Sequence, residues 1–571
     1  MPLRVGPSHG KGVFQSGRAV ASSYTELLLA ISKTLPDGRR KWSNRFQVDR
    51  SKLELNLIGT LVVWITLLGL IAVFLLLVAV HDLFQREDSI LRNFPLVGHG
   101  RSLLISLGPK LRQYIVAAND EERPFTRDQR EWVHSSAEMK NNYSGFGTDN
   151  SIERTNNYLI IKHSSFPLGE TLKGEPGYDP DFRIPVAKVL GGYRKRKKAF
   201  RPQSIVNTSG MSFGSLSAPA VESISRGCHL AGCLQNTGEG GIAPHHDHGS
   251  GLIWQIGTGY FGCRASDGGF SMERFLETVA QHDVRAIEIK LSQGAKPGKG
   301  GVLPATKITP EISKIRGIPM GQDCLSPSSH RVFSDVDGLL DFIELLADKT
   351  GLPVGIKSAV GQLDFWYELA KQISTTQRAP DFIAVDGGEG GTGAAPRVFA
   401  DHVALPFLLG FARVQQIFFD AGLHDKVVFV GSGKLGFPES SLFAFALGCD
   451  MVAIGREAMM AIGCIQAQEC HTGFCPTGVA TQRKWLMRGL TPGVKSHNFA
   501  NYLTNLRKEI LQLCHACGVV HPGLITTDHF EILNPGERSQ SLVEHFSLPT
   551  KSRLPAADDI AEISRLMAAQ K

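Results

Sequence analysis

From Gln203 onward the chain repeats one pattern, in which a short apolar run is followed by glycine or polar residues and then by a helical stretch. Few of the runs alternate polar with apolar residues, which is typical of strands buried on both faces. Stretches such as Asp337–Lys349 and Phe437–Leu447 are predicted to be helices. Eight such units over about 250 residues predict an α/β fold, a closed (β/α)8 TIM-type barrel, with an open doubly wound sheet as the alternative. The eight runs begin near Ser204, Gly232, Arg285, Ile318, Pro353, Asp381, Lys426 and Asp450.

Composition excludes several classes of protein. Hydrophobic residues make up 42% and charged residues 20% of the 571 positions, which excludes a disordered or fibrous chain. The net charge of +7 comes from residues 1–53, where ten Lys and Arg face three acidic residues. The remainder is balanced, so a nucleic-acid partner is not expected.

Residues Leu55–Val80 form a run of 26 residues without a formal charge. As a helix this run spans roughly 39 Å, so residues 54–82 are predicted to cross a membrane once, with a buried core helix as the alternative. Basic residues 39–52 precede the run, and only Arg86 and Arg92 follow it closely. Because the more basic end of a membrane helix usually stays in the cytoplasm, this distribution favours an exterior location for the large domain. The cofactors inferred below are normally inserted in the cytoplasm, and we therefore expect a cytoplasmic catalytic domain.

The expected organisation has five segments. A basic N-terminal segment, which could include a targeting signal, occupies 1–53, and the membrane helix follows at 54–82. An accessory region is expected at 83–200, the barrel with a cysteine motif at 201–483 and a C-terminal extension at 484–571. The basic run Arg194–Lys198 is interpreted as a solvated loop or, less readily, as a docking patch for an acidic carrier or an anionic membrane.

Three cysteines lie within twelve residues, Cys464, Cys470 and Cys475, and Pro476 follows the last. Their spacing favours an iron–sulfur cluster, because a three-iron cluster needs one thiolate per iron. A four-iron cluster would need a further ligand, and zinc, helped by neighbouring His471, is the alternative.

Glycine-rich sequences follow several predicted strands. The sequence Gly431–Gly436 matches G-x-G-x-x-G but is a weak dinucleotide signal at this place in the chain. Loops after the seventh and eighth barrel strands commonly bind phosphate, so Gly431–Gly433, Gly455 and Arg456 are predicted to form a phosphate cradle. Gly387–Gly393 would let the backbone approach the same flat ligand closely.

Charged side chains also lie at strand ends. Glu239 stands among the glycines of residues 236–241. Lys290, Gln293 and Lys296 can face an anionic substrate, although Lys290 could simply pair with a carboxylate and Lys296 could be solvated. Lys357, after the fifth strand, could lie near a flavin N1, where a cation stabilises the reduced ring.

Five motifs resemble the synthase domain of glutamate synthases, and most of all its stand-alone FMN-binding members related to the large subunit. The resemblance runs from Arg201 to Gln482, with the motifs in the same order. They read MSFGSLS (211–217), NTGEGG (236–241), KLSQGAKPGKGG (290–301), DGGEGGTGAAP (386–396) and CIQAQECHTGFCPTGVATQ (464–482).

The resemblance implies an oxidoreductase acting on the CH–NH2 group, with FMN and a 3Fe–4S cluster on Cys464, Cys470 and Cys475, that reduces 2-iminoglutarate to L-glutamate. It implies 2-oxoglutarate contacts from Glu239, Lys290, Gln293 and Lys296. The residues implied around FMN are Met211, Ser212, Gly214, Ser217, Asn236, Lys357, Gly390, Gly391, Thr392, Gly393, Gly431, Ser432, Gly433, Gly455 and Arg456.

Departures from the family pattern shape the expected partners. Pro2 follows Met1 and the first cysteine is Cys228, so no glutaminase domain with an N-terminal cysteine is expected. Val302 stands where the longer enzymes have Gln, and GSG at 431–433 replaces DGG. Without a recognisable NAD(P)H-binding fold, electrons are expected from ferredoxin or a reductase subunit, and nitrogen from ammonia. The alternatives are a transferase resembling an N-methylglutamate synthase subunit and a membrane-tethered electron-transfer or sensor protein.

Overall fold

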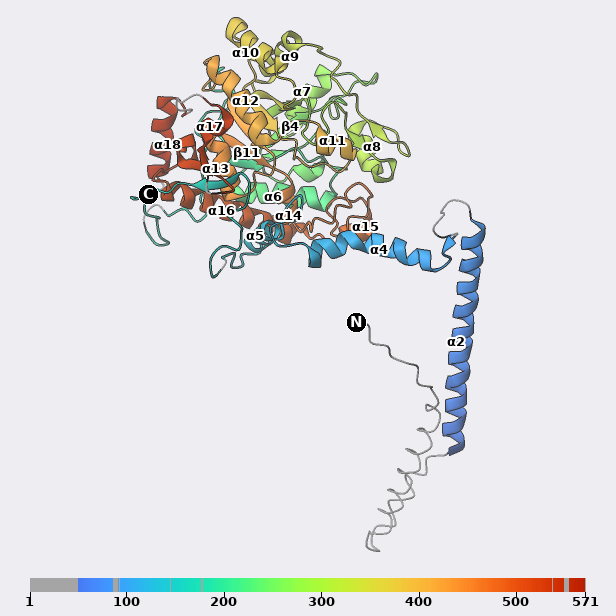
Figure 1. Cartoon of the computed structure of the whole chain (residues 1–571). Coiled ribbons are helices and arrows are strands. Elements are labelled where there is room, and N and C mark those ends of the chain that lie inside the picture. The colour runs from blue at the N-terminus through green and yellow to red at the C-terminus, as the bar shows by residue number, and fades with distance from the viewer. Residues whose placement is uncertain are drawn as a thin grey trace. The chain divides into compact units, whose positions relative to one another are not determined.

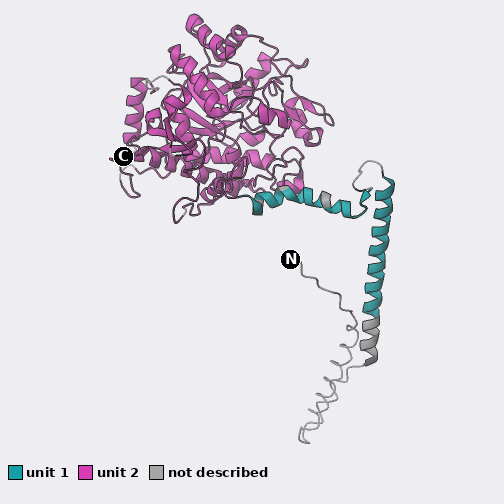
Figure 2. Cartoon of the chain, viewed as in Figure 1, with its two compact units in different colours: residues 1–117 teal, residues 118–571 magenta. Residues whose placement is uncertain are grey.

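The computed structural model describes residues 50–85, 91, 93–143, 145–175, 178–536, 538–548 and 554–569. The chain forms two compact units, Met1–Ala117 and Ala118–Lys571 (Figure 2). The basic segment expected at 1–53 lies outside the described residues except for its last four positions, which belong to a helix.

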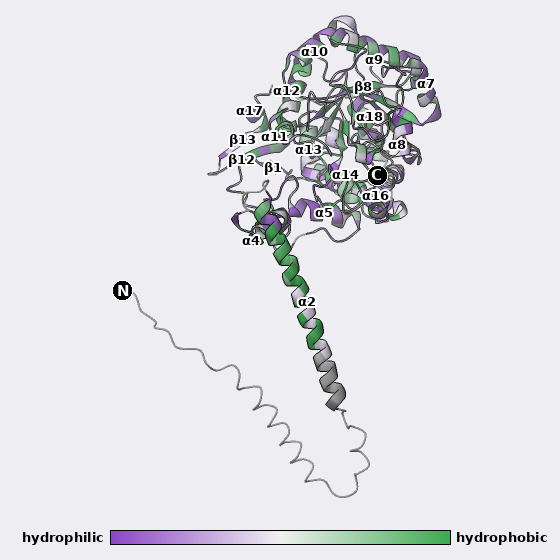
Figure 3. Ribbon diagram, turned by 90° about the vertical axis from the view of Figure 1, so that its right-hand side faces the viewer, coloured by the Kyte–Doolittle hydropathy of each residue, from purple (hydrophilic) through white to green (hydrophobic). Residues whose placement is uncertain are grey.

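The first unit is built on the helix α2 (Arg50–Phe84). Its section Gly59–Phe84 has 26 residues, and the most apolar 18 of them have a mean hydropathy of 3.1 and include no buried residue, so by length and composition the helix is able to cross a membrane. Figure 3 shows this helix as almost uniformly hydrophobic. The helix α4 (Val97–Leu111) follows, and a π-helical turn at Arg112–Val116 ends the unit.

The second unit is an eight-stranded parallel barrel (Figure 1). The strands are hydrogen-bonded in the order β2-β11-β10-β9-β8-β5-β4-β3, and contacts between β2 and β3 close the ring, including a 3.2 Å bond from Thr208 N to Leu234 O. The predicted (β/α)8 fold is therefore confirmed. The strands are β2 (Val206–Thr208), β3 (Gln235–Asn236), β4 (Leu252–Ile256), β5 (Val284–Lys290), β8 (Val354–Ala359), β9 (Phe382–Asp386), β10 (Val428–Ser432) and β11 (Met451–Ile454).

One predicted strand is wrong and one strand is missing from the prediction. The apolar run at Ile318 forms no strand, because the left-handed Gly317 precedes it and Pro319, which has no backbone N–H to donate to a ladder, follows it. The third barrel strand is instead β4, whose five residues are all buried. Lys290 consequently ends the fourth strand and not the third.

Helices cover the outside of the barrel. Apolar faces predict the two helices named above, which are observed as α9 and α13. The bounds are α6 (Ala218–Ala231), α7 (Met272–Gln281), α8 (Pro310–Arg316), α9 (Val336–Thr350), α10 (Asp364–Thr376), α11 (Arg397–His402), α12 (Phe407–Asp420), α13 (Pro438–Ala446) and α14 (Arg456–Ala461).

Segments on both sides of the barrel sequence close its remaining faces. The long helix α16 packs on α6 so tightly that a Cβ on Gly227 would lie 2.6 Å from the Phe499 ring, which explains a glycine within a helix. A strand before the barrel pairs with the first of two strands after it, and the three form an antiparallel sheet. These elements are α5 (Arg127–Ala137), α15 (Lys484–Met487), α16 (Pro492–Ala516), α17 (Leu542–Phe546), α18 (Ala557–Ala569), β1 (Tyr158–Ile161), β12 (Phe530–Asn534) and β13 (Arg538–Ser541).

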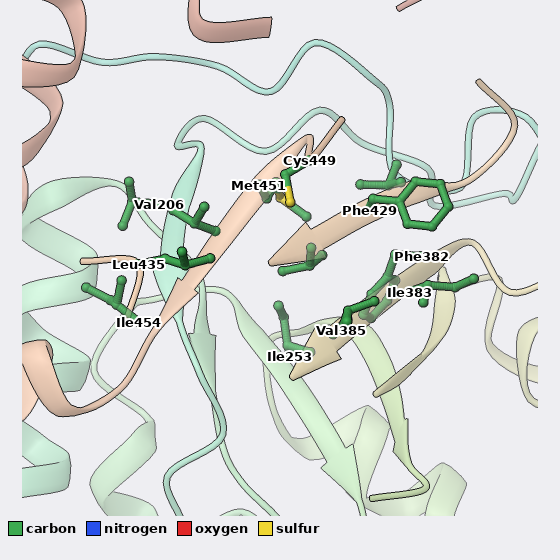
Figure 4. Close-up of a cluster of buried hydrophobic side chains, with 14 of the residues drawn as sticks. Val206, Ile253, Phe382, Ile383, Val385, Phe429, Leu435, Cys449, Met451 and Ile454 are labelled. Atoms are coloured by element: carbon green, nitrogen blue, oxygen red, sulfur yellow. The ribbon is translucent and has the colours of Figure 1, made fainter. Parts of the chain in front are cut away.

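The core lies between the strands and this helical layer. Figure 4 shows side chains from neighbouring strands, among them Phe382, Phe429 and Met451, converging in one apolar cluster. All ten cysteines are free, as expected for a chain without a disulfide framework. In the basic run 194–198, Arg196 is bound to Asp381 at 3.0 Å and also pairs with Glu344, so part of this run holds the fold together and is not solvated.

Candidate active site

A cavity of about 590 Å³ lies where the barrel strands end. This volume falls within the range usual for cofactor and substrate sites. Its lining comes from the ends of several strands and from the glycine-rich loops after them, together with the cysteine segment. In barrel enzymes this face carries the chemistry, as predicted for this chain.

One side of the cavity holds a carboxylate and a lysine at the ends of β3 and β5. The Lys290 Nζ atom lies 2.7 Å from Glu239 Oε1 and 2.5 Å from Gln293 Oε1, and both oxygens accept hydrogen bonds from the ammonium. Burial acts to raise the pKa of Glu239, but the adjacent Lys290 outweighs it and the pKa is lowered. The carboxylate of Glu239 is therefore ionised. Lys290 pairs with it, as in the alternative to a direct substrate contact.

Lys296 lies in the loop beyond β5 and is only 4% exposed. It is therefore not the solvated loop residue that was considered as the alternative. Burial lowers the pKa of Lys296, and Glu239 opposes this shift. Among the described residues the Lys296 ammonium has no hydrogen-bond or ion-pair partner, and it lines the cavity beside Gln293. An anion in the cavity would supply the missing counter-charge.

A third lysine, Lys357, also lines the cavity. The Lys357 ammonium donates a hydrogen bond of 3.0 Å to Ser209 Oγ and lies 3.6 Å from Asp386 Oδ1. Asp386 in turn accepts the backbone N–H of Gly294 at 2.8 Å. This network fixes a buried cation against the cavity, with its position set by residues of β8, the end of β9 and the residue that follows β2.

Most of the residues predicted to cradle a phosphate lie at the ends of β10 and β11. Arg456 and Lys434 both lie over the Phe125 ring, at 4.8 Å and 5.1 Å from its centroid. Arg456 also donates to the Glu389 carbonyl at 2.6 Å. A Cβ on Gly391 would lie 2.6 Å from the Arg456 side chain, so only glycine allows this arrangement. Two half-buried cations beside glycine backbone suit an anionic phosphate.

The cysteine segment forms the opposite wall. Cys464, Cys470 and Cys475 all line the cavity, and burial raises the pKa of Cys464 to about 12, with the other two thiols adding to the shift. Among the described residues, no three His, Cys, Asp or Glu side chains are already gathered as a metal site. The three thiols thus share a cavity wall without forming a closed coordination set.

Two polar side chains from elsewhere hold this segment. Lys307 is buried and donates to the carbonyl oxygens of Cys470 and Ala480, at 2.7 Å and 3.0 Å. Gln466 pairs with both backbone groups of Phe125, each at 3.0 Å. The segment is therefore tied to the loop between β5 and β8 and to the chain before the barrel.

Most of the predicted site residues meet in this cavity. The lining includes the four predicted substrate contacts and the three cysteines, and it includes Met211, Ser212, Lys357, Gly390, Gly391, Thr392, Gly393, Ser432, Gly433, Gly455 and Arg456. Four other predicted residues are placed outside the lining. Asn236 donates to Glu288 within the barrel and Ser217 caps α6, while Gly214 and Gly431 pack against side chains.

Several lining residues are absent from the prediction. Gln255 belongs to the unpredicted strand β4, and Arg316 ends α8 and donates to Phe213 O at 2.9 Å. Lys434, directly after Gly431–Gly433, could have been found because it continues the glycine-rich loop. The residues next to Phe125 and Lys307 in the sequence form no motif that would indicate that these two side chains line the cavity.

Comparison with known proteins assigns the family. Residues 185–520 match the model described as the conserved region in glutamate synthase. The chain is 36% identical to the glutamate synthase large subunit-like protein YerD of Bacillus subtilis over 495 residues, covering 81% of this chain and 94% of that protein. It is also 36% identical to the archaeal glutamate synthase [NADPH] of Methanocaldococcus jannaschii, of which it spans 58%. A flavocytochrome b2 variant overlays with a TM-score of only 0.40 at 14% identity, which adds nothing to the assignment. The chain belongs to the glutamate synthase family.

Proposed function

We propose that this protein is an FMN- and iron–sulfur-dependent oxidoreductase that makes L-glutamate from 2-oxoglutarate and ammonia through 2-iminoglutarate. The observation that carries the proposal is the buried, unpartnered Lys296 beside the Glu239–Lys290 pair, in a cavity whose other end holds the Lys434 and Arg456 cations. One end suits a dicarboxylate and the other suits a phosphate.

The residues present fit FMN. Lys434 and Arg456 would hold its phosphate, and Gly391 leaves the space that a side chain would fill. Lys357 would face the flavin ring as a fixed cation. When bound, the flavin supplies hydride transfer, and a nearby cation favours its reduced form.

The donor set of the opposite wall fits an iron–sulfur cluster. Cys464, Cys470 and Cys475 would provide three thiolates from one segment, which suits a 3Fe–4S cluster. Lys307 supports this assignment, because its buried ammonium lies near Cys470 and Cys475 and would offset the negative charge of a thiolate-bound cluster.

The substrate end works by charge and position. Lys296 would bind a substrate carboxylate directly, since it has a donor free for that purpose and lies in a low-dielectric site. Lys290 stays oriented by Glu239 and Gln293, so a second cation is presented at a fixed point. Holding both carboxylates of the substrate in one orientation presents its C2 atom to the flavin side of the cavity.

The partners and location are part of the same proposal. Electrons come from ferredoxin or a reductase subunit, because the only parallel sheet among the described residues is the barrel itself. Ammonia is taken from solution or from a partner. The α2 helix anchors the protein in a membrane with the barrel in the cytoplasm, where such cofactors are inserted.

The experiment is a comparison of two lysines in one loop. Lys296→Ala is expected to leave the flavin content unchanged and to weaken 2-oxoglutarate binding about tenfold or more, through loss of a charge-assisted contact. Lys299→Ala is the matched control, because Lys299 is exposed and lies over the Phe399 ring. Titration of the flavin absorbance with 2-oxoglutarate measures both. Equal affinities for the two variants, or no response of the wild-type protein, would remove the dicarboxylate from the proposal.

A separate assay tests the transferase alternative. Product formed from glutamate and methylamine without any reductant would favour an N-methylglutamate synthase-like subunit over the reductive reaction. Iron and acid-labile sulfide per chain, with low-temperature electron paramagnetic resonance, test the cluster directly, and zinc without iron would contradict it.

A further inference from the structure

The α4 helix presents an apolar face that nothing in its own unit covers. Leu104, Leu107 and Leu111 follow one another at intervals of three and four residues, so they lie on the same side of the helix. They are 67%, 40% and 44% exposed. Ser106 lies on the other side of the helix, where its hydroxyl bonds to the Leu103 carbonyl. A soluble surface seldom presents such a continuous apolar strip without a binding partner.

The direction of α4 is fixed relative to α2 by one buried carboxylate. Asp82, near the end of α2, is fully buried and accepts hydrogen bonds from Leu96 N at 3.0 Å and from His99 Nε2 at 3.0 Å. Both donors belong to the first residues of α4 or directly precede it. In Figure 1 the α4 helix runs sideways away from the end of α2, and in the rotated view of Figure 3 it is seen nearly end-on. If α2 crosses a bilayer, α4 would therefore lie along the membrane plane.

The charge of this segment points to an anionic surface. Residues 89–119 contain no Asp or Glu and four basic residues, Arg92, Arg101, Lys110 and Arg112. Lys110 and Arg112 are exposed next to Leu111. Leucines on one face with cations beside them are the composition of helices that lie in the interface of negatively charged membranes.

We propose that α4 lies in the headgroup region of an anionic bilayer, with Leu104, Leu107 and Leu111 toward the acyl chains. The proposal rests on the membrane-spanning role proposed for α2 and adds a second, peripheral contact to it. The 15 residues of α4 would cover about 22 Å of membrane surface, and the hydrogen bonds of Asp82 would hold the start of that helix at the end of the span.

Matched tryptophan substitutions test the proposal in the full-length protein. Leu104→Trp and Ser106→Trp introduce the same fluorophore on opposite faces of α4. Both proteins are reconstituted in vesicles of phosphatidylcholine and phosphatidylglycerol, with and without brominated acyl chains. The added emission of Leu104→Trp is expected to be quenched at least twofold more strongly than that of Ser106→Trp. Equal quenching of the two, or an unquenched but blue-shifted Leu104→Trp, would overturn the proposal, the latter because protein and not lipid then covers the face.

Native Trp64 separates failure of this proposal from failure of the span. It lies within Gly59–Phe84 and is 61% exposed, so bromine should quench it if α2 crosses the bilayer, and Trp64→Phe should remove that signal. Quenched Trp64 with unquenched Leu104→Trp would refute the α4 contact alone, and unquenched Trp64 would refute the span. In phosphatidylcholine alone the difference between the two α4 variants is expected to shrink, and an unchanged difference would refute the role of anionic lipid.

Discussion

The two walls of the cavity are held in different ways. The strand-end wall, which carries Glu239, Lys290 and Lys357, inherits its geometry from the hydrogen-bonded ring of barrel strands. The cysteine wall has no strand or helix between Cys464 and Cys475, and it is positioned by side chains that reach it from distant segments. Register thus places one wall, and a few long-range polar contacts place the other.

This difference teaches where each wall is vulnerable. A wall built on strands fails when backbones can no longer approach each other, whereas a wall built on polar contacts fails when one buried donor or acceptor loses its partner. Changes of the two kinds should therefore separate flavin binding from retention of the cluster.

The largest effect is expected at Gly294 in the strand-end wall. A Cβ there would lie 1.7 Å from the Gly387 carbonyl oxygen, so Gly294→Ala forces two loops apart and breaks the bond to Asp386. We expect a loss of about 3 kcal/mol or more in the free energy of unfolding, together with loss of flavin. Thermal unfolding and flavin content measure this. Gly361→Ala is the control, because no atom lies within 4 Å of its added carbon. Similar melting temperatures for the two variants would show that this wall is not set by close backbone approach.

A smaller effect is expected at His521, which lies outside both walls, and it concerns how the stability of the whole fold depends on pH. Its Nε2 atom lies 2.8 Å from the Pro185 carbonyl, and Nδ1 accepts from Gly523 N at 2.9 Å, which requires the neutral ring. Burial lowers the pKa of His521 to about 4. Between pH 6.5 and about 4, His521 is therefore protonated in the unfolded chain but not in the folded chain. The free energy of unfolding consequently falls as the pH falls through this interval.

For this one group the loss between pH 7 and pH 5 is about 2 kcal/mol. His521→Gln keeps a donor and an acceptor but cannot titrate, so its stability should depend less on pH over that interval. Denaturant unfolding at the two pH values, compared with the wild-type protein, measures the difference. An identical pH dependence in the variant would mean that folding does not lower the pKa of His521.

The smallest effect on overall stability is expected at Gln466 in the cysteine wall. Gln466→Ala leaves both backbone groups of Phe125 unpaired in a buried place, which typically costs about 1 to 2 kcal/mol. Its main consequence should be fewer iron atoms per chain with normal flavin content. Gln468→Ala is a close control, because both residues have a left-handed backbone and Gln468 is exposed. If flavin were lost together with iron, the two walls would not be independent.

The sequence predicts the strand-end wall well and the cysteine wall only in part. Lys290, Lys357 and Gly433 follow apolar runs, and the barrel rule places whatever follows a strand at one face. The strand β4 is not predicted, because its apolar run LIWQI resembles any short buried segment. The run at Ile318 is predicted to be a strand on the same kind of local evidence, and that prediction is wrong. The cysteines were recognised by spacing, but the contact between Gln466 and Phe125 spans 341 positions and has no local signature.

The segment between β5 and β8 is an interruption that the barrel tolerates. These two strands pair directly, so the intervening residues 291–353 leave the ring intact. This excursion alone supplies Lys296, Val302, Lys307 and Arg316 to the cavity, and it adds a small antiparallel pair of strands, β6 (Val302–Leu303) and β7 (Cys324–Leu325), with α8 between them. Lys296, the proposed substrate contact, and Lys307, which holds the cysteine segment, therefore come from one insertion between paired strands. The sequence of that insertion can change without altering how the eight strands pair.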